Sequence, residues 1–264
     1  MISYDEGADA YHANPAIGSS DIRAFMRSPI LFNKQRDGKW PKETPAMLFG
    51  TASHMSMLEP ERFQKTYVIK PAGTRASTIA GSAWHAKVDA LGMKPIAADD
   101  AAALMEMHAT MPPEIDAILK RSKAEVTFRT SIASGVEVQC RIDALDGVQP
   151  YDLKTIKAIE TIDGAIHRLG YHIQANWYER VMEAETGTAP APLRFIFVEN
   201  APPYRWRLVD LDADYRAIAS KAVDDALSEL AARMKSGAWV DRDDLHYLAS
   251  PPDWMNDATF DGEE

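Results

Sequence analysis

Apolar and polar residues alternate along two stretches near the middle of the chain, residues 125–132 and 136–145. Both stretches are rich in β-branched or aromatic residues, and this period of two predicts two β-strands. A Ser-Gly pair separates them, an Asp-Gly pair follows the second, and a short apolar run occupies residues 151–156. Because such glycine-containing pairs favour tight turns between strands, the pattern predicts a meander of three strands.

Apolar residues recur at helical spacing on both sides of this meander. Helices are expected at residues 22–28 (with N-caps at 19–21), 46–58, 97–111, 115–119, 159–169, 171–185 and 212–237, and a further hairpin at residues 193–211. Residues 66–95 begin with a possible short strand and continue as a small, polar, glycine-containing stretch, which indicates a mobile loop. Strands and helices in this order predict an α/β fold with a mixed central sheet flanked by helices.

The length of 264 residues is compatible with one large domain, and we expect a single domain over residues 1–264. Within it we expect a loosely structured arm at residues 1–18, a core at residues 19–249 and an acidic tail at residues 250–264. No apolar run is long enough to span a bilayer, the N-terminus lacks a signal-peptide pattern, and the single Cys140 excludes internal disulfides. These features predict a cytoplasmic protein with no membrane partner.

The charged residues on the predicted meander include Glu125, Asp143, Asp152 and Lys154. Asp143 is near the end of the second strand, and Asp152 is near the start of the third, across a short turn. Asp152 and Lys154 are two positions apart and share one face of their strand. Two carboxylates and an ammonium group therefore converge, and carboxylates suit Mg²⁺ or Mn²⁺. A solvated strand with a salt bridge is the competing interpretation.

Two further motifs flank this group, Gly50-x-x-x-His54 upstream and Gln174-x-x-x-Tyr178 downstream. In this order, with a strand-ending Asp and an Asp-x-Lys between them, they resemble the RecB-like branch of the PD-(D/E)xK nucleases, which have a restriction-endonuclease-like core. The nuclease domain of RecE-type exonuclease VIII and its phage relatives is similar in the segments CRIDAL, YDLKT and YHIQANWYERV. The resemblance covers the chain from about Ser19 to about Lys235.

The resemblance implies a metal-dependent exonuclease that needs no ATP and degrades one strand of linear double-stranded DNA from its 5′ end. Its product, a 3′ single-stranded tail, would pass to a single-strand annealing protein of the RecT type in phage recombination, in the cytoplasm of a bacterial host. Relatives close homo-oligomeric rings, so a trimer or tetramer is expected. A RecB-like endonuclease, an exonuclease of other polarity and a non-catalytic DNA-end-binding protein are the alternatives.

The resemblance also implies roles for individual residues. Asp143, Asp152 and His54 would hold Mg²⁺, with Mn²⁺ possible, and the backbone carbonyl of Leu153 would be a further ligand. Lys154 would assist the nucleophilic water. Gln174 and Tyr178 would orient Lys154 or touch the DNA backbone, with an ordinary hydrogen-bonded helix surface as the competing interpretation. Glu125 would either support the metal ligands from behind or bind a second metal. For His54, an ordinary core histidine is the competing interpretation.

Charge is distributed unevenly along the chain, whose net charge is −10. Residues 20–87 contain 11 Lys and Arg against 5 Asp and Glu, so this segment is basic within an acidic protein. Arg23 and Arg27 share a face of the first predicted helix, and Arg75 lies in the predicted loop, so all three are candidates for contacts to DNA phosphates. Basic residues scattered over a solvated surface are an equally good interpretation.

Overall fold

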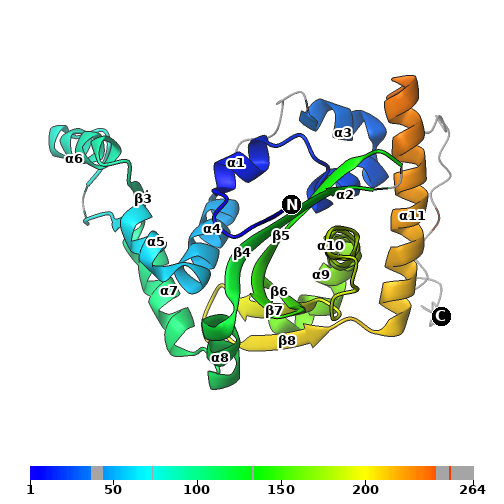
Figure 1. Cartoon of the computed structure of the whole chain (residues 1–264). Coiled ribbons are helices and arrows are strands. Elements are labelled where there is room, and N and C mark those ends of the chain that lie inside the picture. Colours follow the sequence, from blue (N-terminus) through cyan, green and yellow to red (C-terminus); the bar gives the residue numbers. More distant parts are fainter. Residues whose placement is uncertain (37–43, 73, 133, 242–249, 251–264) are drawn as a thin grey trace, which may run out of the picture.

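The structure is a computed structural model that describes residues 1–36, 44–72, 74–132, 134–241 and 250. Its main sheet has six strands in the order β1-β4-β5-β6-β7-β8 (Figure 1). The strands are β1 (Ile2–Ser3), β4 (Lys123–Ser131), β5 (Glu137–Asp146), β6 (Gln149–Ile156), β7 (Arg194–Glu199) and β8 (Trp206–Asp210). The predicted meander is therefore confirmed as β4, β5 and β6, which pair antiparallel in sequence order.

One pair of neighbours in this sheet, β6 and β7, runs parallel, so the sheet is mixed as predicted. A parallel connection needs a crossover that leaves one end of the sheet and returns to the other. Here the crossover contains a 3₁₀ turn, η1 (Ile159–Thr161), and the helices α9 (Ile162–Arg168) and α10 (Tyr171–Thr186). It brings the Gln174 motif back over the strand that carries Asp152 and Lys154.

Side chains alternate between the two faces of β7, as the period of two requires. Phe195 and Phe197 enter one hydrophobic core, whereas Ile196 and Val198 enter a second. Buried residues of α2 (Ser19–Arg27), α3 (Pro29–Arg36), α10 and α11 (Ala213–Ser236) belong to the first core, and those of α4 (Pro45–Leu58), α7 (Ala98–Ala109) and α8 (Pro113–Arg121) belong to the second. Helices therefore cover the sheet on both faces.

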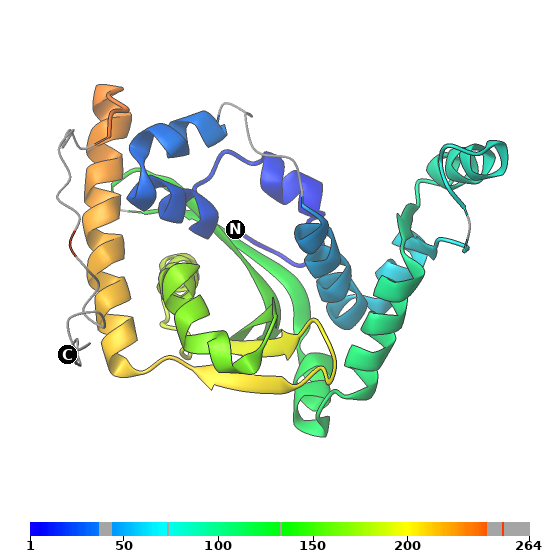
Figure 2. The same ribbon diagram turned by 180° about the vertical axis from the view of Figure 1, so that it is seen from behind.

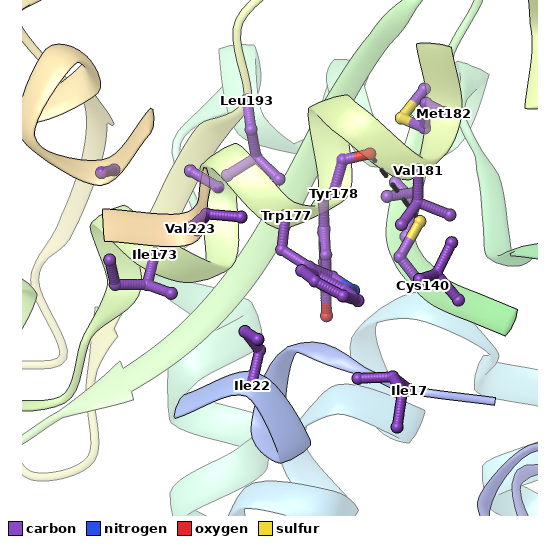
Figure 3. Packing of buried hydrophobic residues seen from close by; sticks show 14 of the residues in the cluster. Ile17, Ile22, Cys140, Ile173, Trp177, Tyr178, Val181, Met182, Leu193 and Val223 are labelled. Carbon is purple, nitrogen blue, oxygen red and sulfur yellow. Dashed lines mark hydrogen bonds between the residues drawn. The ribbon is translucent and has the colours of Figure 1, made fainter. Parts of the chain in front are cut away.

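The first core surrounds α10. Figure 3 shows Trp177 of this helix near Cys140 of β5 and above Ile17 and Ile22 of the N-terminal segment. Trp177 is 1% exposed, and its indole N–H donates a 2.9 Å hydrogen bond to the carbonyl of Gln139. This packing fixes α10 against the sheet and with it the site residues that the helix carries.

The N-terminal arm is more ordered than the sequence led us to expect. Strand β1 pairs with β4 at the edge of the sheet, and α1 (Ala8–Ala13) follows it. Ile17 forms an isolated bridge with Val138 and is 1% exposed. The expectation of a loosely structured arm is wrong for these residues, because a few apolar side chains and one strand pair dock them. The acidic tail lies outside the described residues, apart from position 250.

Residues 60–96 form a projection, here named the α6 arm, that stands away from the sheet beyond α4 in both views (Figures 1 and 2). It comprises α5 (Pro60–Thr66), β2 (Tyr67–Ile69), α6 (Ile79–Ala90) and β3 (Lys94–Ile96). Strands β2 and β3 pair in parallel. The sequence predicted a mobile loop here, and that prediction is wrong for α6: Thr78 caps the helix by accepting a hydrogen bond from the Gly81 N–H.

In the described part of the chain, no helix is long and apolar enough to cross a membrane.

Candidate active site

Strand β6 carries Asp152 and Lys154 two positions apart, and their side chains lie on the face of the strand that α10 covers. Asp152 is 1% exposed, and its Oδ2 lies 2.5 Å from Lys154 Nζ in an ion pair. Its Oδ1 accepts a 2.7 Å hydrogen bond from Gln174 Nε2. The Asp-x-Lys motif is therefore a buried, partnered pair, and the solvated strand with a salt bridge does not describe it.

Asp143 lies where β5 and β6 separate. Counted from the turn, the last backbone pair of these strands is Ala144 with Tyr151, and Asp143 is the next residue of β5. Instead of a further backbone pair, Asp143 Oδ2 accepts a 2.8 Å hydrogen bond from the N–H of Leu153. The same oxygen lies 3.4 Å from Nδ1 of His54, which approaches from α4. The Asp143 carboxylate thus connects the neighbouring strands β5 and β6 to helix α4, which is far from them in the sequence.

Glu125 joins this group from β4 in an unusual backbone conformation. Its φ is +55°, in the left-handed region that costs a non-glycine residue about 1–3 kcal/mol. The register of β4 with β5 skips Glu125, and its carboxylate forms an ion pair with Arg141. In this conformation a carboxylate oxygen of Glu125 lies within 4.8 Å of ligand atoms of Asp143 and His54.

The residues fit a divalent cation. One ligand atom from each of His54, Glu125 and Asp143 lies within 4.8 Å of the others, and this is the only such group among the described residues. An imidazole with carboxylates is a donor set for Mg²⁺, Mn²⁺ and other divalent ions. Asp152 lies outside this group, with its oxygens held by Lys154 and Gln174. Its buried Oδ2 has the Lys154 ammonium as an ion-pair partner but accepts no hydrogen bond of good geometry.

Burial dominates the protonation of the site. It raises the pKa of Asp152 to about 7, although the charge of Lys154 opposes the rise. It also raises the pKa of Glu125 to about 7, and the charge of Asp143 adds to this. Burial lowers the pKa of His54, against the charge of Asp143 and a hydrogen bond with the backbone of Leu153. The site therefore holds a neutral imidazole and crowded carboxylates, which a bound cation would stabilise in their charged form.

Gln174 and Tyr178 lie at the site but contact different groups from those expected. Gln174 Nε2 donates to Asp152 and also donates a 2.9 Å hydrogen bond to the Tyr178 hydroxyl. Tyr178 is 7% exposed. The hydrogen bonds of Gln174 therefore run to the carboxylate and not to Lys154, and the buried Tyr178 supports Gln174.

Tyr171 is a site residue that sequence reasoning missed. Its ring lies 5.0 Å from Lys154 Nζ, within the range of a cation–π contact, and packs against Phe195 and Phe197. For Lys154 itself, burial would lower the pKa, but the charges of Asp152 and Asp143 raise it above its ordinary value. A signal for Tyr171 existed, because it lies three positions before Gln174 on one helix and so shares its face.

The three arginines predicted to contact DNA lie in two places. Arg23 Nη1 donates a 2.6 Å hydrogen bond to the carbonyl of Leu169. The positive charge of Arg23 opposes part of the rise in the pKa of Asp152. Arg23 and Arg27 both line a cavity of about 750 Å³ that also includes Arg168 and Tyr171. Arg75 is exposed and belongs to the α6 arm, which stands away from the sheet.

Residues 18–249 match a family described as a PDDEXK-like domain of unknown function, DUF3799. The chain belongs to this PDDEXK-like family. This agrees with the superfamily predicted from the motifs, whereas the RecE-type assignment within it stays a prediction. No protein of curated function matches the chain in sequence.

Among solved structures, the PDDEXK-like chain is similar to the crystal structure of a "Putative exonuclease" from Eubacterium rectale. The two share 16% sequence identity and a TM-score of 0.62, over 96% of this chain and 97% of the other. At this identity the likeness shows the fold alone. A second structure, that of SSO0001, aligns at 12% identity with a TM-score of 0.27 over 78% of this chain and 85% of the other, which carries no weight.

Proposed function

We propose that this PDDEXK-like protein is an exodeoxyribonuclease of the RecE type that degrades one strand of linear double-stranded DNA from 5′ to 3′ without ATP. The convergence of His54, Asp143, Asp152 and Lys154 at one buried site supports this most directly. The motif order that resembles RecE-type nucleases supports the finer assignment of polarity and substrate.

Mg²⁺, or Mn²⁺ in its place, would be held by His54, Asp143, Asp152 and the carbonyl of Leu153, and it would supply Lewis acidity and water activation at the phosphodiester. Asp152, which lies outside the group of His54, Glu125 and Asp143, would have to exchange its ion pair with Lys154 for the cation. Lys154 Nζ orients the attacking water and stabilises the negative charge that develops on the phosphoryl oxygens. In this scheme the carboxylates fix the position of the cation, and the ammonium group of Lys154 acts mainly in the transition state.

Four other side chains complete the scheme. Gln174 keeps the Asp152 carboxylate in one orientation through its hydrogen bond. Glu125 has a carboxylate oxygen within 4.8 Å of the ligand atoms of His54 and Asp143, and it would bind the same cation or a second one beside it. Arg23 and Arg27 hold phosphates of the substrate next to the cavity that they line. Each of these roles is separable by substitution.

The proposal extends to assembly and partners. The chain acts as one nuclease domain in a homo-oligomeric ring, a trimer or tetramer, in the cytoplasm of a bacterial host. The 3′ single-stranded product passes to an annealing protein of the RecT type. A closed ring would hold the duplex between successive cuts, because linear DNA can leave it only at an end. Light scattering that gives several times 29.3 kDa would support the ring, and a strict monomer would overturn it.

The experiment is digestion of a linear duplex that carries a fluorescent label at either the 5′ or the 3′ end. We expect early release of the 5′ label in Mg²⁺, no release in EDTA, and no cleavage of a closed circle. Early release of the 3′ label would reverse the polarity, and cleavage of the circle would indicate an endonuclease. A chain that digests no DNA with Mg²⁺ or Mn²⁺ would overturn the proposed function.

A further inference from the structure

The α6 arm carries positive charge without compensation. Residues 60–96 contain six Lys and Arg against two Asp and Glu, a local charge of +4 in a chain of −10. Five of these cations form no ion pair in the described structure: Lys65, Lys70, Arg75, Lys87 and Lys94. Lys70 is half-buried and the other four are exposed.

Most arginines outside the arm are paired, whereas Arg23, Arg27, Arg36, Arg168 and Arg207 form no ion pair in the described structure. In the described part of the chain, eight arginines outside the arm form ion pairs with carboxylates: Arg121, Arg129, Arg141, Arg180, Arg194, Arg205, Arg216 and Arg233. A paired cation contributes little to the long-range field, whereas unpaired cations add together. The arm is therefore a source of positive potential on an otherwise acidic protein.

One of the five cations is held on a constrained backbone. Thr78 Oγ1 donates a 2.9 Å hydrogen bond to the carbonyl of Arg75 and accepts one of 3.1 Å from the N–H of Gly81. Gly81 approaches so closely that a Cβ there would lie 1.8 Å from the carbonyl oxygen of Arg75. The loop that presents Arg75 is thus fixed to the start of α6, and its guanidinium group remains exposed.

The arm is attached to the helix that contributes His54 to the site. Helix α4 ends at Leu58, α5 begins at Pro60, and the chain returns through α7, which contacts α4. Both ribbon views show the arm extending past α4 and away from the sheet (Figures 1 and 2). A nucleic acid that has one phosphodiester at the site and extends past α4 has further phosphates near the place where the arm begins.

We propose that the α6 arm binds the sugar–phosphate backbone of the duplex outside the active site, through Lys65, Lys70, Arg75, Lys87 and Lys94. The inference rests on the proposed function, since it takes DNA as the substrate. Duplex DNA carries one negative charge about every 1.7 Å along its axis, so an array of unpaired cations finds partners at any register. Such contacts carry no sequence information and suit an enzyme that moves along DNA.

The test compares two full-length variants of equal net charge. The arm variant replaces Lys65, Arg75, Lys87 and Lys94 with Gln. The control replaces four exposed cations outside the arm, Lys120, Arg207, Lys221 and Lys235, with Gln. Binding of a fluorescent duplex of about 40 base pairs is measured by anisotropy at several salt concentrations, with Ca²⁺ in place of Mg²⁺ so that the DNA is retained.

Each phosphate contact contributes about 0.9 to the slope of log K against log salt for duplex DNA. We expect the arm variant to lose about two to four units of slope relative to wild type, and the control to lose less than about one unit. Gly81→Ala, which displaces the Arg75 backbone, should lose about one unit. Equal slopes for the arm variant and the control would overturn the proposal.

Two further outcomes distinguish DNA binding by the arm from a role in subunit assembly and from a failure of the nuclease assignment. If the arm variant lowers the oligomeric mass in light scattering but keeps the wild-type slope, the arm is an interface between copies of this chain, and the proposal is wrong. If wild type itself neither binds nor digests DNA, the proposed function fails. If wild type digests DNA and the arm variant digests and binds equally well, only the arm proposal fails.

Discussion

The buried site and the α6 arm carry their charges in opposite ways. At the site, Asp152 pairs with Lys154, Glu125 pairs with Arg141, and Asp143 accepts the Leu153 N–H. On the arm, five of the six cations have no such partner in the described structure, and four of these five are exposed to water. Burying a charge is costly unless it is paired and hydrogen-bonded, so the site can hold its charged groups only in one arrangement. Exposed cations cost little and act at longer range.

This difference separates two tasks. A fixed, partnered group of charges suits chemistry, because it places each atom within a few tenths of an ångström of its working position. An exposed array suits affinity, because it tolerates many positions of a polyanion. Substitutions at the site should therefore affect turnover, and substitutions on the arm should affect binding and its salt dependence.

Asp152→Asn should give the largest effect. It keeps the side-chain shape and the contact with Gln174 but removes a carboxylate that the proposed cation needs, so we expect turnover to fall at least about 10³-fold. The measurement is digestion of end-labelled duplex at saturating Mg²⁺, with binding followed separately in Ca²⁺. Digestion at nearly the wild-type rate would show that the site is assigned wrongly.

Lys154→Met should be almost as severe for turnover but should leave cation binding largely intact. The ammonium group acts on charge that develops in the transition state, and Met retains much of the apolar stem, so we expect a loss of about 10²–10³-fold in kcat. Isothermal titration with Mn²⁺ provides the check. Lost Mn²⁺ affinity combined with normal turnover at saturating Mn²⁺ would contradict this role.

The spacing of Asp152 and Lys154 was predictable from the sequence, because a strand repeats every two residues and both positions lie within one short strand. The burial of the pair was not, since it depends on α10, which returns over the sheet after the crossover. The contact of His54 with Asp143 joins residues 89 positions apart, and no local pattern encodes it. The positive φ of Glu125, at a position that the pairing of β4 with β5 skips, likewise has no signal in the local sequence.

The α6 arm shows the opposite limit of sequence reasoning. Residues 79–90 contain many small residues, Gly81 lies within them and Gly92 follows shortly after. This composition favoured a loop. The helix forms because Thr78 caps it and Val88 packs inward, although few of its other residues are buried. A helix with so narrow an apolar stripe has a weak periodic signal. The basic character of the segment, by contrast, was visible from residue counts alone.

The stability of the cation-free protein should depend on pH through the site. The pKa values of Asp152 and Glu125 are about 7, above the ordinary values near 4 of an unfolded chain. The native state therefore holds these protons more tightly, and the resulting stability is present below about pH 4 and lost as pH rises through about 7. As pH rises from about 4 to about 7, we expect ionisation of the two groups to lower the free energy of unfolding by a few kcal/mol.

Urea unfolding in EDTA at about pH 5 and about pH 8 measures this effect, with the Glu125→Gln, Asp152→Asn double variant as the control. The variant should lose less stability between the two pH values than wild type does, because neither replaced group can ionise. Equal pH dependence of the two proteins would show that these carboxylates are not protonated in the native site.

Tyr171→Leu should lower kcat about tenfold while leaving KM unchanged, because the ring holds Lys154 by a cation–π contact worth about 0.5–2 kcal/mol. Tyr171→Phe keeps the ring and should retain nearly full activity. Both variants are compared with Phe195→Leu, which removes a ring that packs on Tyr171 but contacts no site cation in the described structure. If Phe195→Leu lowers kcat as much as Tyr171→Leu does, Tyr171 acts only through general packing.

The smallest effect is expected at the surface of the arm. Ile79 is 93% exposed at the start of α6, so Ile79→Ala removes almost no buried area and should change the free energy of unfolding by less than about 0.5 kcal/mol. Phe197, which is fully buried in the core under α10, should cost about 3–5 kcal/mol when replaced by Ala. Urea midpoints of the two variants give the comparison directly. A loss above about 1 kcal/mol for Ile79→Ala would mean that the tip of the arm is covered in solution, and the arm would then be an unsuitable surface for DNA.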